Sequence, residues 1–372
     1  MPTLGLTLTP RLSPQLANGA MGAILYQPFP ALSAAVLATT AVVTLLPSNA
    51  GGQVAVSFRG TPFPDARVEE IGQSLALGLV VGMAATRDGE VLIVDRSTSK
   101  VLRVARNGEA VVTYGGPGDG PGEFRAPYRV AERSDGSVIV FDLANERFSE
   151  FSADGRFVRR WATSARIVSI GSIVPLPDRA VAITGIVRDP RAAARAVHVF
   201  DSTFQLVRSF GPLSRARSRE LLEQWIPGDL RTTRAGNLLY LRLTPYELYW
   251  YSPEGRLVKS VAVPKRVIAT VDEFFSVRRS GTTVTTRTER GRPYPLWALP
   301  LRDGRILAAR TDAGVKYWDM IDAAGRVVHS GRAPALLGGP VQLHSSTSDE
   351  AWFTGTTGDG EPVLYFVQFA ER

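Results

Sequence analysis

The sequence predicts an all-β fold built from repeated four-stranded antiparallel sheets, and its composition and internal repeat lead to this prediction. The chain has 372 residues with 35 Gly and 25 Pro. Because both residue types punctuate turns, this composition favours many short strands over long helices. Residues 79–115 and 126–161 also share one pattern. Each has an apolar run, an Asp-Gly turn, a strand ending in Asp, a polar loop, a third strand, a Gly turn and a fourth strand.

The spacing of the turns extends this repeat along the chain. Two turn glycines lie 19 residues apart in three units and 21 residues apart in a fourth. These pairs are Gly89 and Gly108, Gly136 and Gly155, Gly236 and Gly255, and, at the longer spacing, Gly304 and Gly325. A four-stranded meander cannot bury both of its faces alone, so units with a period of about 45 residues must stack around an axis. The sequence therefore predicts a six-bladed β-propeller.

The six blades are assigned from the same spacing. They are expected at residues 79–115, 126–161, 167–213, 225–263 and 294–332, with a sixth that begins near Pro340. Only 23 residues follow Asp349, so the last blade lacks its outer strand. We expect the N-terminal strand Val54–Phe58 to fill this place and close the ring, because closure removes exposed sheet edges.

Two insertions interrupt the period, and both fall between blades. Residues 214–224 are expected to form a short helical turn, and residues 264–293 an extra hairpin or a lid. Long loops in compact domains are more often functional or mobile than structural.

The N-terminal segment 1–50 differs in composition from the rest of the chain. It contains no Asp or Glu, and its most apolar stretch, Ala31–Leu46, is shorter than the roughly 20 residues that span a membrane. Ser48 and Ala50 supply the small residues of a signal-peptidase site. We expect export to the periplasm or the outside with residues 51–372 as a single propeller domain; the alternative is an uncleaved membrane anchor.

Charge and cysteine content exclude several classes of function. With no cysteine, the chain has no disulfide framework, thiolate zinc site or cysteine nucleophile. The net charge is +8, but the 43 basic residues are spread along the chain among 35 acidic ones rather than gathered in runs. A dedicated polyanion binder usually shows such runs, so binding of nucleic acid is not expected.

Blade two resembles the NHL repeat, whose pattern is Gly-Glu-Phe, a proline, an apolar strand, Asp-Gly, a strand ending in Asp, and Asn-x-Arg. The matching residues are Gly122, Glu123, Phe124, Pro127, Asp135, Gly136, Asp142, Asn145 and Arg147. The chain as a whole is similar to exported bacterial six-bladed propellers of the NHL-like group. That resemblance implies a binding module that uses its top face, the end of the ring at which the crossovers enter the inner strands.

One residue of each inner strand is expected near the top of the axis, six positions before the first turn. These ring residues are Gly82, Arg129, Ser172, Asp229, Trp297 and Leu343. A cation, an acid and a large aromatic ring around one cavity are typical of a site for a small ligand or a peptide. In the alternative interpretation, Arg129 and Asp229 pair across the channel and Trp297 packs between blades.

The candidate ligand-binding set extends beyond the ring. It consists of Tyr128, Arg129, Asp229, Trp297, His344, Asp142, Asn145 and Arg147. The last three can instead fix their own loop, because Asp and Asn side chains often bond nearby backbone groups. The opposite, bottom turns, such as Asp88-Gly89 and Asp135-Gly136, look suited to tight reversal alone.

Enzymatic alternatives come from the wider propeller group. Its peptide-amidating lyases hold zinc through several histidines, and its gluconolactonase-like hydrolases hold a divalent cation. Of the three histidines here, His198 and His329 fall away from the inner strands, so a three-histidine zinc site is not expected. We expect a non-enzymatic, monomeric binding module for a protein or small molecule, without catalytic residues, metal or cofactor. The alternative is a divalent-metal hydrolase or lyase around Asp229, Glu132 and His344.

Overall fold

The structure is a computed structural model of the chain. It describes residues 53–54, 63, 66–71, 75–217, 219–224, 228–263, 269–280, 283–288, 293–334, 349–356 and 362–369. All of these residues belong to the unit Val42–Arg372. The predicted signal region, together with Leu343 and His344, lies outside the described residues.

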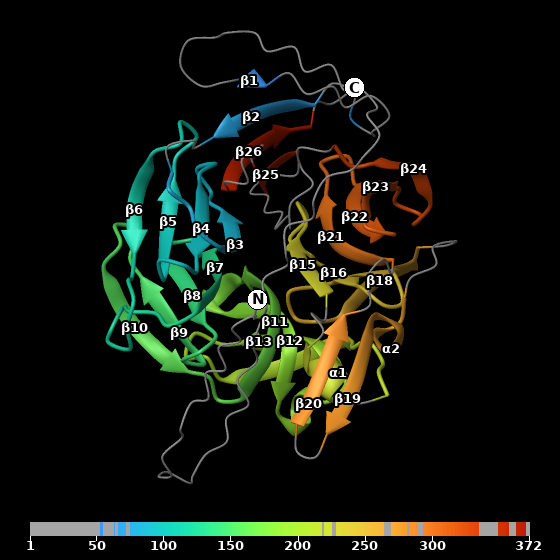
Figure 1. Cartoon of the computed structure of the whole chain (residues 1–372), viewed down its shortest axis with the longest axis horizontal. Coiled ribbons are helices and arrows are strands. Elements are labelled where there is room, and N and C mark those ends of the chain that lie inside the picture. Colours follow the sequence, from blue (N-terminus) through green and yellow to red (C-terminus); the bar gives the residue numbers. More distant parts are fainter. Residues whose placement is uncertain are drawn as a thin grey trace, which may run out of the picture. The chain divides into compact units, whose positions relative to one another are not determined.

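Six four-stranded antiparallel sheets surround an axis, which confirms the predicted six-bladed β-propeller (Figure 1). Blades one to five each use four consecutive strands, with the first strand innermost. Blade one contains β3 (Val80–Ala85), β4 (Val91–Asp95), β5 (Lys100–Val104) and β6 (Ala110–Tyr114). Blade two contains β7 (Pro127–Glu132), β8 (Val138–Asp142), β9 (Arg147–Phe151) and β10 (Phe157–Ala162).

The next three blades have the same order of strands. Blade three contains β11 (Arg166–Pro175), β12 (Val181–Arg188), β13 (Arg195–Phe200) and β14 (Leu206–Pro212). Blade four contains β15 (Gly228–Thr232), β16 (Leu238–Arg242), β17 (Glu247–Tyr251) and β18 (Leu257–Ala262). Blade five contains β21 (Tyr294–Pro300), β22 (Ile306–Asp312), β23 (Val315–Ile321) and β24 (Val327–Arg332).

The sixth blade combines both ends of the chain. Its order from the axis outward is β25 (Glu350–Thr356), β26 (Pro362–Gln368), β2 (Arg67–Ile71) and β1 (Gln53–Val54). Closure of the ring by an N-terminal strand is therefore confirmed, but two N-terminal strands take part rather than one. β2 supplies the third strand, and β25 is the innermost of the described strands; residues 55–58 of the predicted closing strand lie outside the described residues.

The turn glycines explain why the blades repeat with this spacing. All eight predicted turn glycines adopt φ values between 78° and 91°. Residues other than glycine rarely occupy this left-handed region, so glycine permits the tight reversals between strands.

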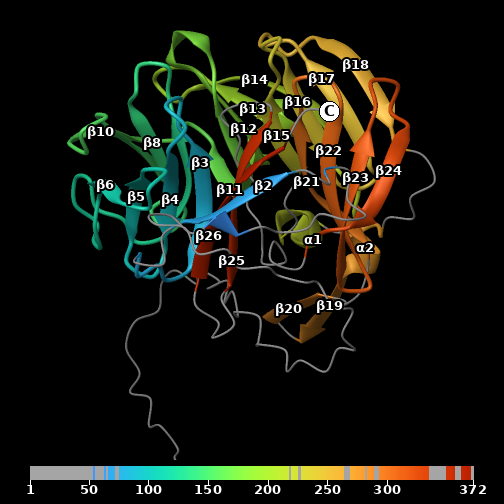
Figure 2. The same ribbon diagram turned by 90° about the horizontal axis from the view of Figure 1, so that it is seen from above.

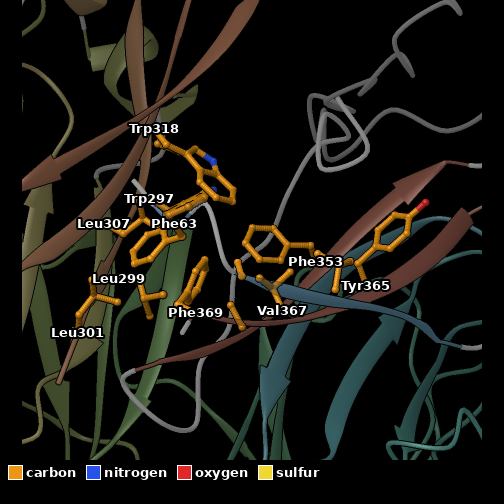
Figure 3. Close-up of a cluster of buried hydrophobic side chains, with 14 of the residues drawn as sticks. Phe63, Trp297, Leu299, Leu301, Leu307, Trp318, Phe353, Tyr365, Val367 and Phe369 are labelled. Carbon is orange, nitrogen blue, oxygen red and sulfur yellow. The ribbon is translucent and has the colours of Figure 1, made fainter. Parts of the chain in front are cut away.

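The core consists of apolar clusters between adjacent blades rather than one central cluster. Between blades five and six, Trp297, Trp318 and Phe353 pack with Phe369, as Figure 3 shows. The rings of Trp318 and Phe353 are stacked with centroids 5.9 Å apart. Each blade is thus held by the hydrophobic faces of its two neighbours.

The segments between blades three, four and five contain the additional elements. α1 (Arg219–Gln224) precedes blade four, and α2 (Val271–Phe274) leads into the hairpin of β19 (Phe275–Ser280) and β20 (Thr283–Thr288). Leu221 of α1 and Val271 of α2 are buried against strands of blades four and five. The hairpin forms a sheet of its own next to α2, away from the strands of the blades (Figure 2). Within the described residues, no helix is long and apolar enough to cross a membrane.

Candidate functional site

Five of the six ring residues lie on inner strands as predicted, whereas Leu343 lies outside the described residues, and four of these strands are irregular at this level. Gly82 lies on β3, Arg129 on β7, Ser172 on β11, Asp229 on β15 and Trp297 on β21. The pairing register between the inner strand and its neighbour shifts, as in a β-bulge, just before three of these residues and around a fourth. These shifts fall at Val80/Gly82, Pro127/Arg129, Pro295/Trp297 and Ile170/Ile173. Bulges change the direction of a side chain and are common at barrel rims and near binding sites.

Arg129 links the inner strands of three blades. Its Nε donates to the carbonyl oxygen of Gly171 at 2.5 Å, and its Nη1 donates to those of Val81 at 2.6 Å and Tyr128 at 2.9 Å. The guanidinium also lies over the Tyr128 ring, 4.0 Å from its centroid. Only 6% of the residue is exposed. The planar guanidinium can bond several carbonyls at once, so Arg129 holds blades one, two and three together.

Gly82 is required by the close approach of β3 and β7. A Cβ atom at this position would lie 2.6 Å from the carbonyl oxygen of Tyr128. No side chain fits there without moving the backbone, so glycine sets the contact between the first two inner strands.

Asp229 is the corresponding link on the other side of the ring. Ser172 Oγ donates to its Oδ1 at 2.8 Å. Arg231 Nε and the backbone N–H of Ala298 donate to its Oδ2 at 3.0 and 3.2 Å. These bonds join the inner strands of blades three, four and five, and both carboxylate oxygens accept hydrogen bonds within the protein.

The predicted pairing of Arg129 with Asp229 is wrong, because each has partners on its own neighbouring strands. The interpretation of Trp297 as a packing residue between blades is confirmed. Its ring contacts those of Trp318 and Phe353 in edge-on geometry, with centroids 6.2 and 6.0 Å away. Its indole Nε1 is buried and has no hydrogen-bond partner among the described residues.

Asp142 fixes the loop by which the chain enters blade two. Its oxygens accept hydrogen bonds from the backbone N–H groups of Arg125 and Ala126, both at 3.0 Å. They also accept bonds from the backbone and the side chain of Asn145. Asp95 in blade one accepts backbone N–H bonds in the same way. The repeated aspartate is thus engaged with the backbone.

Arg147 orders the glycine-rich crossover between blades one and two. Its Nη atoms donate to the carbonyl oxygens of Asp119, Gly120 and Glu123 at 2.7 to 3.1 Å. Phe124, at the end of the crossover, is buried between the two blades. The exposed part of the crossover displays an ion pair of Arg125 with Asp119 at 2.6 Å.

The carboxylates of the metal-dependent alternative do not come together. Glu132 ends β7 at the bottom of its blade, where it pairs with Arg103 and accepts a bond from the N–H of Arg87. Burial raises the pKa of the Glu132 carboxyl. Asp229 lies instead near the start of β15, and His344 lies outside the described residues. In the part of the chain that the structure describes, no group of three or more His, Asp or Glu residues could hold a metal ion.

His198 is a buried strand residue. Its two ring nitrogens lie 2.9 Å from Ser209 Oγ and 3.0 Å from the carbonyl oxygen of Gly185. Burial lowers the pKa of the imidazole to about 4, so the ring is neutral at physiological pH.

The bottom turns do more than reverse the chain, contrary to our expectation. Asp88 pairs with Arg103 at 2.6 Å, and Asp135 pairs with Arg179 of the next blade. These contacts join residues that are distant in the sequence, so no local motif indicates them. The sequence holds one weak indication that the second of these turns is not a plain reversal. Arg133 lies two residues before it, at the position that Thr86 occupies in blade one.

Comparisons with known proteins identify the fold. No protein-family model matches the sequence, and no curated protein does. Among solved structures, a candidate exported protein of Bacteroides fragilis aligns with a TM-score of 0.58 at 13% identity, covering 84% of this chain and 97% of that protein. A gluconolactonase of Xanthomonas campestris aligns with a TM-score of 0.52 at 13% identity, covering 88% and 98%. A streptogramin B lyase aligns with a TM-score of 0.50 at 11% identity, covering 82% and 98%.

These similarities show the propeller fold and no more, because a function cannot be inferred from a shared fold at such low sequence identity. The neighbours include both a candidate exported protein and enzymes. The resemblance of blade two to the NHL repeat stays a prediction.

Proposed function

We propose that the chain is an exported, non-enzymatic binding propeller of the NHL-like group that takes a protein or a small ligand on its top face. The observation that supports this most directly is the row of bulges at the ring residues. Four inner strands shift register at the positions of the ring residues. Bulges disrupt ladder bonds, so their repetition at one level is typical of a region that presents side chains or backbone groups for recognition.

The rigidity of the top face supports the same proposal. Arg129 is held by three carbonyl groups, and Arg147 holds three carbonyl groups of the crossover. Ordering an exposed, glycine-rich loop costs conformational entropy. A loop that is ordered before binding avoids this cost when a partner docks, which favours affinity. In this proposal Tyr128 and the Asp119–Arg125 pair contact the ligand, whereas Asp142, Asn145 and Arg147 keep their loop in place.

A metal-dependent hydrolase or lyase is less well supported. Both oxygens of Asp229 accept hydrogen bonds from the frame, and Glu132 is paired with Arg103 at the other end of the inner strands. Carboxylates that bind a catalytic cation need free lone pairs that converge on one point. For export, the support is the composition of residues 1–50 together with the similarity to a candidate exported protein.

A ligand screen with matched variants tests the proposal. Libraries of small molecules and peptides are screened by thermal shift on the mature protein, and hits are repeated on Arg125→Ala and Arg156→Ala. Both arginines are exposed, and each pairs with a different aspartate. Arg125 lies on the top face, whereas Arg156 lies in a bottom turn. We expect Arg125→Ala to weaken a hit that Arg156→Ala leaves unchanged. Loss of binding in Arg156→Ala alone, or turnover with a stoichiometric metal ion, would contradict the proposal.

A further inference from the structure

The junction of blades two and three contains a buried arginine without hydrogen bonds. Arg133 follows β7 directly, and only 2% of its side chain is exposed. Within the described residues, none of its three guanidinium nitrogens has a hydrogen-bond partner. Its ion-pair partner, Glu150 Oε1, lies 3.5 Å from Nη1. A guanidinium has five N–H donors, and leaving them unpaired in a protein interior is costly.

Glu150 makes no hydrogen bond to Arg133 and is shared with two other arginines. Arg159 Nε donates to Oε2 at 3.0 Å, and Arg179 Nη2 donates to Oε1. Arg179 also pairs with Asp135. The junction therefore holds three arginines and two carboxylates, an excess of one positive charge.

The equivalent junction of blades one and two has the opposite balance. Arg103 occupies on β5 the position that Glu150 occupies on β9, and it pairs with Asp88, Glu90 and Glu132. Thr86 stands where blade two has Arg133. The repeat itself thus does not need an arginine at this position.

Burial penalises the unpaired charge of Arg133. It lowers the pKa of the guanidinium, and the nearby Glu150 carboxylate opposes this shift only in part. An arginine nevertheless stays charged in proteins, so the junction needs both acceptors and a compensating negative charge. Arg159 and Arg179, at the same junction, are about half exposed, so the cluster reaches the surface of the protein.

We propose that the junction of blades two and three binds a monovalent inorganic anion such as chloride against the Arg133 guanidinium. A single negative charge cancels the excess of the cluster. A spherical ion also accepts several N–H bonds without a strict angular requirement, unlike a carboxylate. Buried water would supply acceptors but no charge, and the experiments separate these two occupants.

The first experiment measures folding against chloride concentration. Urea unfolding is followed at constant ionic strength while gluconate replaces chloride. Above the dissociation constant, a tenfold rise in chloride should raise the ratio of folded to unfolded parent protein about tenfold. Arg133→Thr, which copies Thr86 of blade one, should lose this dependence. Arg156→Thr, a change at an exposed arginine of the same blade, should keep it. A parent that does not respond to chloride, or an equal response in Arg133→Thr, overturns the proposal.

The second experiment needs no variant to fold. Crystals of the parent protein are grown with bromide in place of chloride, and anomalous scattering locates the ion. A peak within hydrogen-bond distance of the Arg133 nitrogens supports the proposal. Density for water alone at these nitrogens refutes it.

Discussion

Replacing Arg129 by methionine separates a structural from a ligand-binding role of this residue. The side chain donates three hydrogen bonds to carbonyl groups of three blades, and it is almost fully buried. Methionine keeps an unbranched apolar stem but is shorter than arginine and donates none of these bonds. At about 1.5 kcal/mol for each of the three bonds from a charged donor, the free energy of unfolding should fall by roughly 4.5 kcal/mol.

Urea unfolding of the parent and the variant measures this difference. Arg156→Met is the matched control, because it removes an exposed arginine and should leave the stability unchanged. A loss below about 1 kcal/mol in Arg129→Met would refute the reasoning, since the three carbonyls would then be satisfied equally well without the arginine. Arg129 would in that case be available to a ligand in a wet channel.

Three further predictions concern a buried imidazole, a glycine contact and the closure of the ring. Because its pKa is about 4 in the folded state and near 6.5 when unfolded, His198 stabilises the fold fully above pH 6.5. This contribution falls by up to about 1.4 kcal/mol per pH unit as the pH drops toward 4, and urea unfolding of His198→Gln should show a flatter pH profile. Gly82→Ala should lower stability by about 2 kcal/mol, whereas Gly116→Ala, with open space around the new Cβ, should leave it unchanged; equal melting temperatures would contradict this. A chain starting at Ala76 lacks β1 and β2 and should not melt cooperatively in calorimetry. A chain starting at Gly60 lacks β1 but keeps β2, and it should still melt cooperatively; equal behaviour of the two would argue against closure by β2.

The repeat could be predicted because its signals are local. Asp-Gly turns need glycine at a fixed place, so the positions of Gly89 and Gly136 reveal two hairpins directly. The loop-fixing role of Asp142 is equally local, because Asn145 is three residues away. β2 was missed since its sequence, RVEEI, has no turn glycine at the repeat spacing.

The contacts of the inner ring could not be predicted from the sequence. Arg129 bonds carbonyl groups 42 and 48 residues away. Backbone carbonyls exist in every residue, so no sequence pattern marks the two that are used. The same holds for Arg133, whose isolation depends on how Arg159 and Arg179 divide Glu150 between them.

The sharing of blade six between the chain ends has a consequence for the order of folding. Arg67 pairs with Gln368 about 300 residues later, so this sheet forms only after the whole chain is available. Until then, β2 has no partner strand from the C-terminal part of the chain. The apolar faces of blades one and five that pack against blade six are exposed to water during this time. A chain that emerges from its N-terminus first spends this interval vulnerable to aggregation, and slow, long-range pairing prolongs it. After closure, proteolytic removal of β26, or of β1 and β2, would open the same sheet.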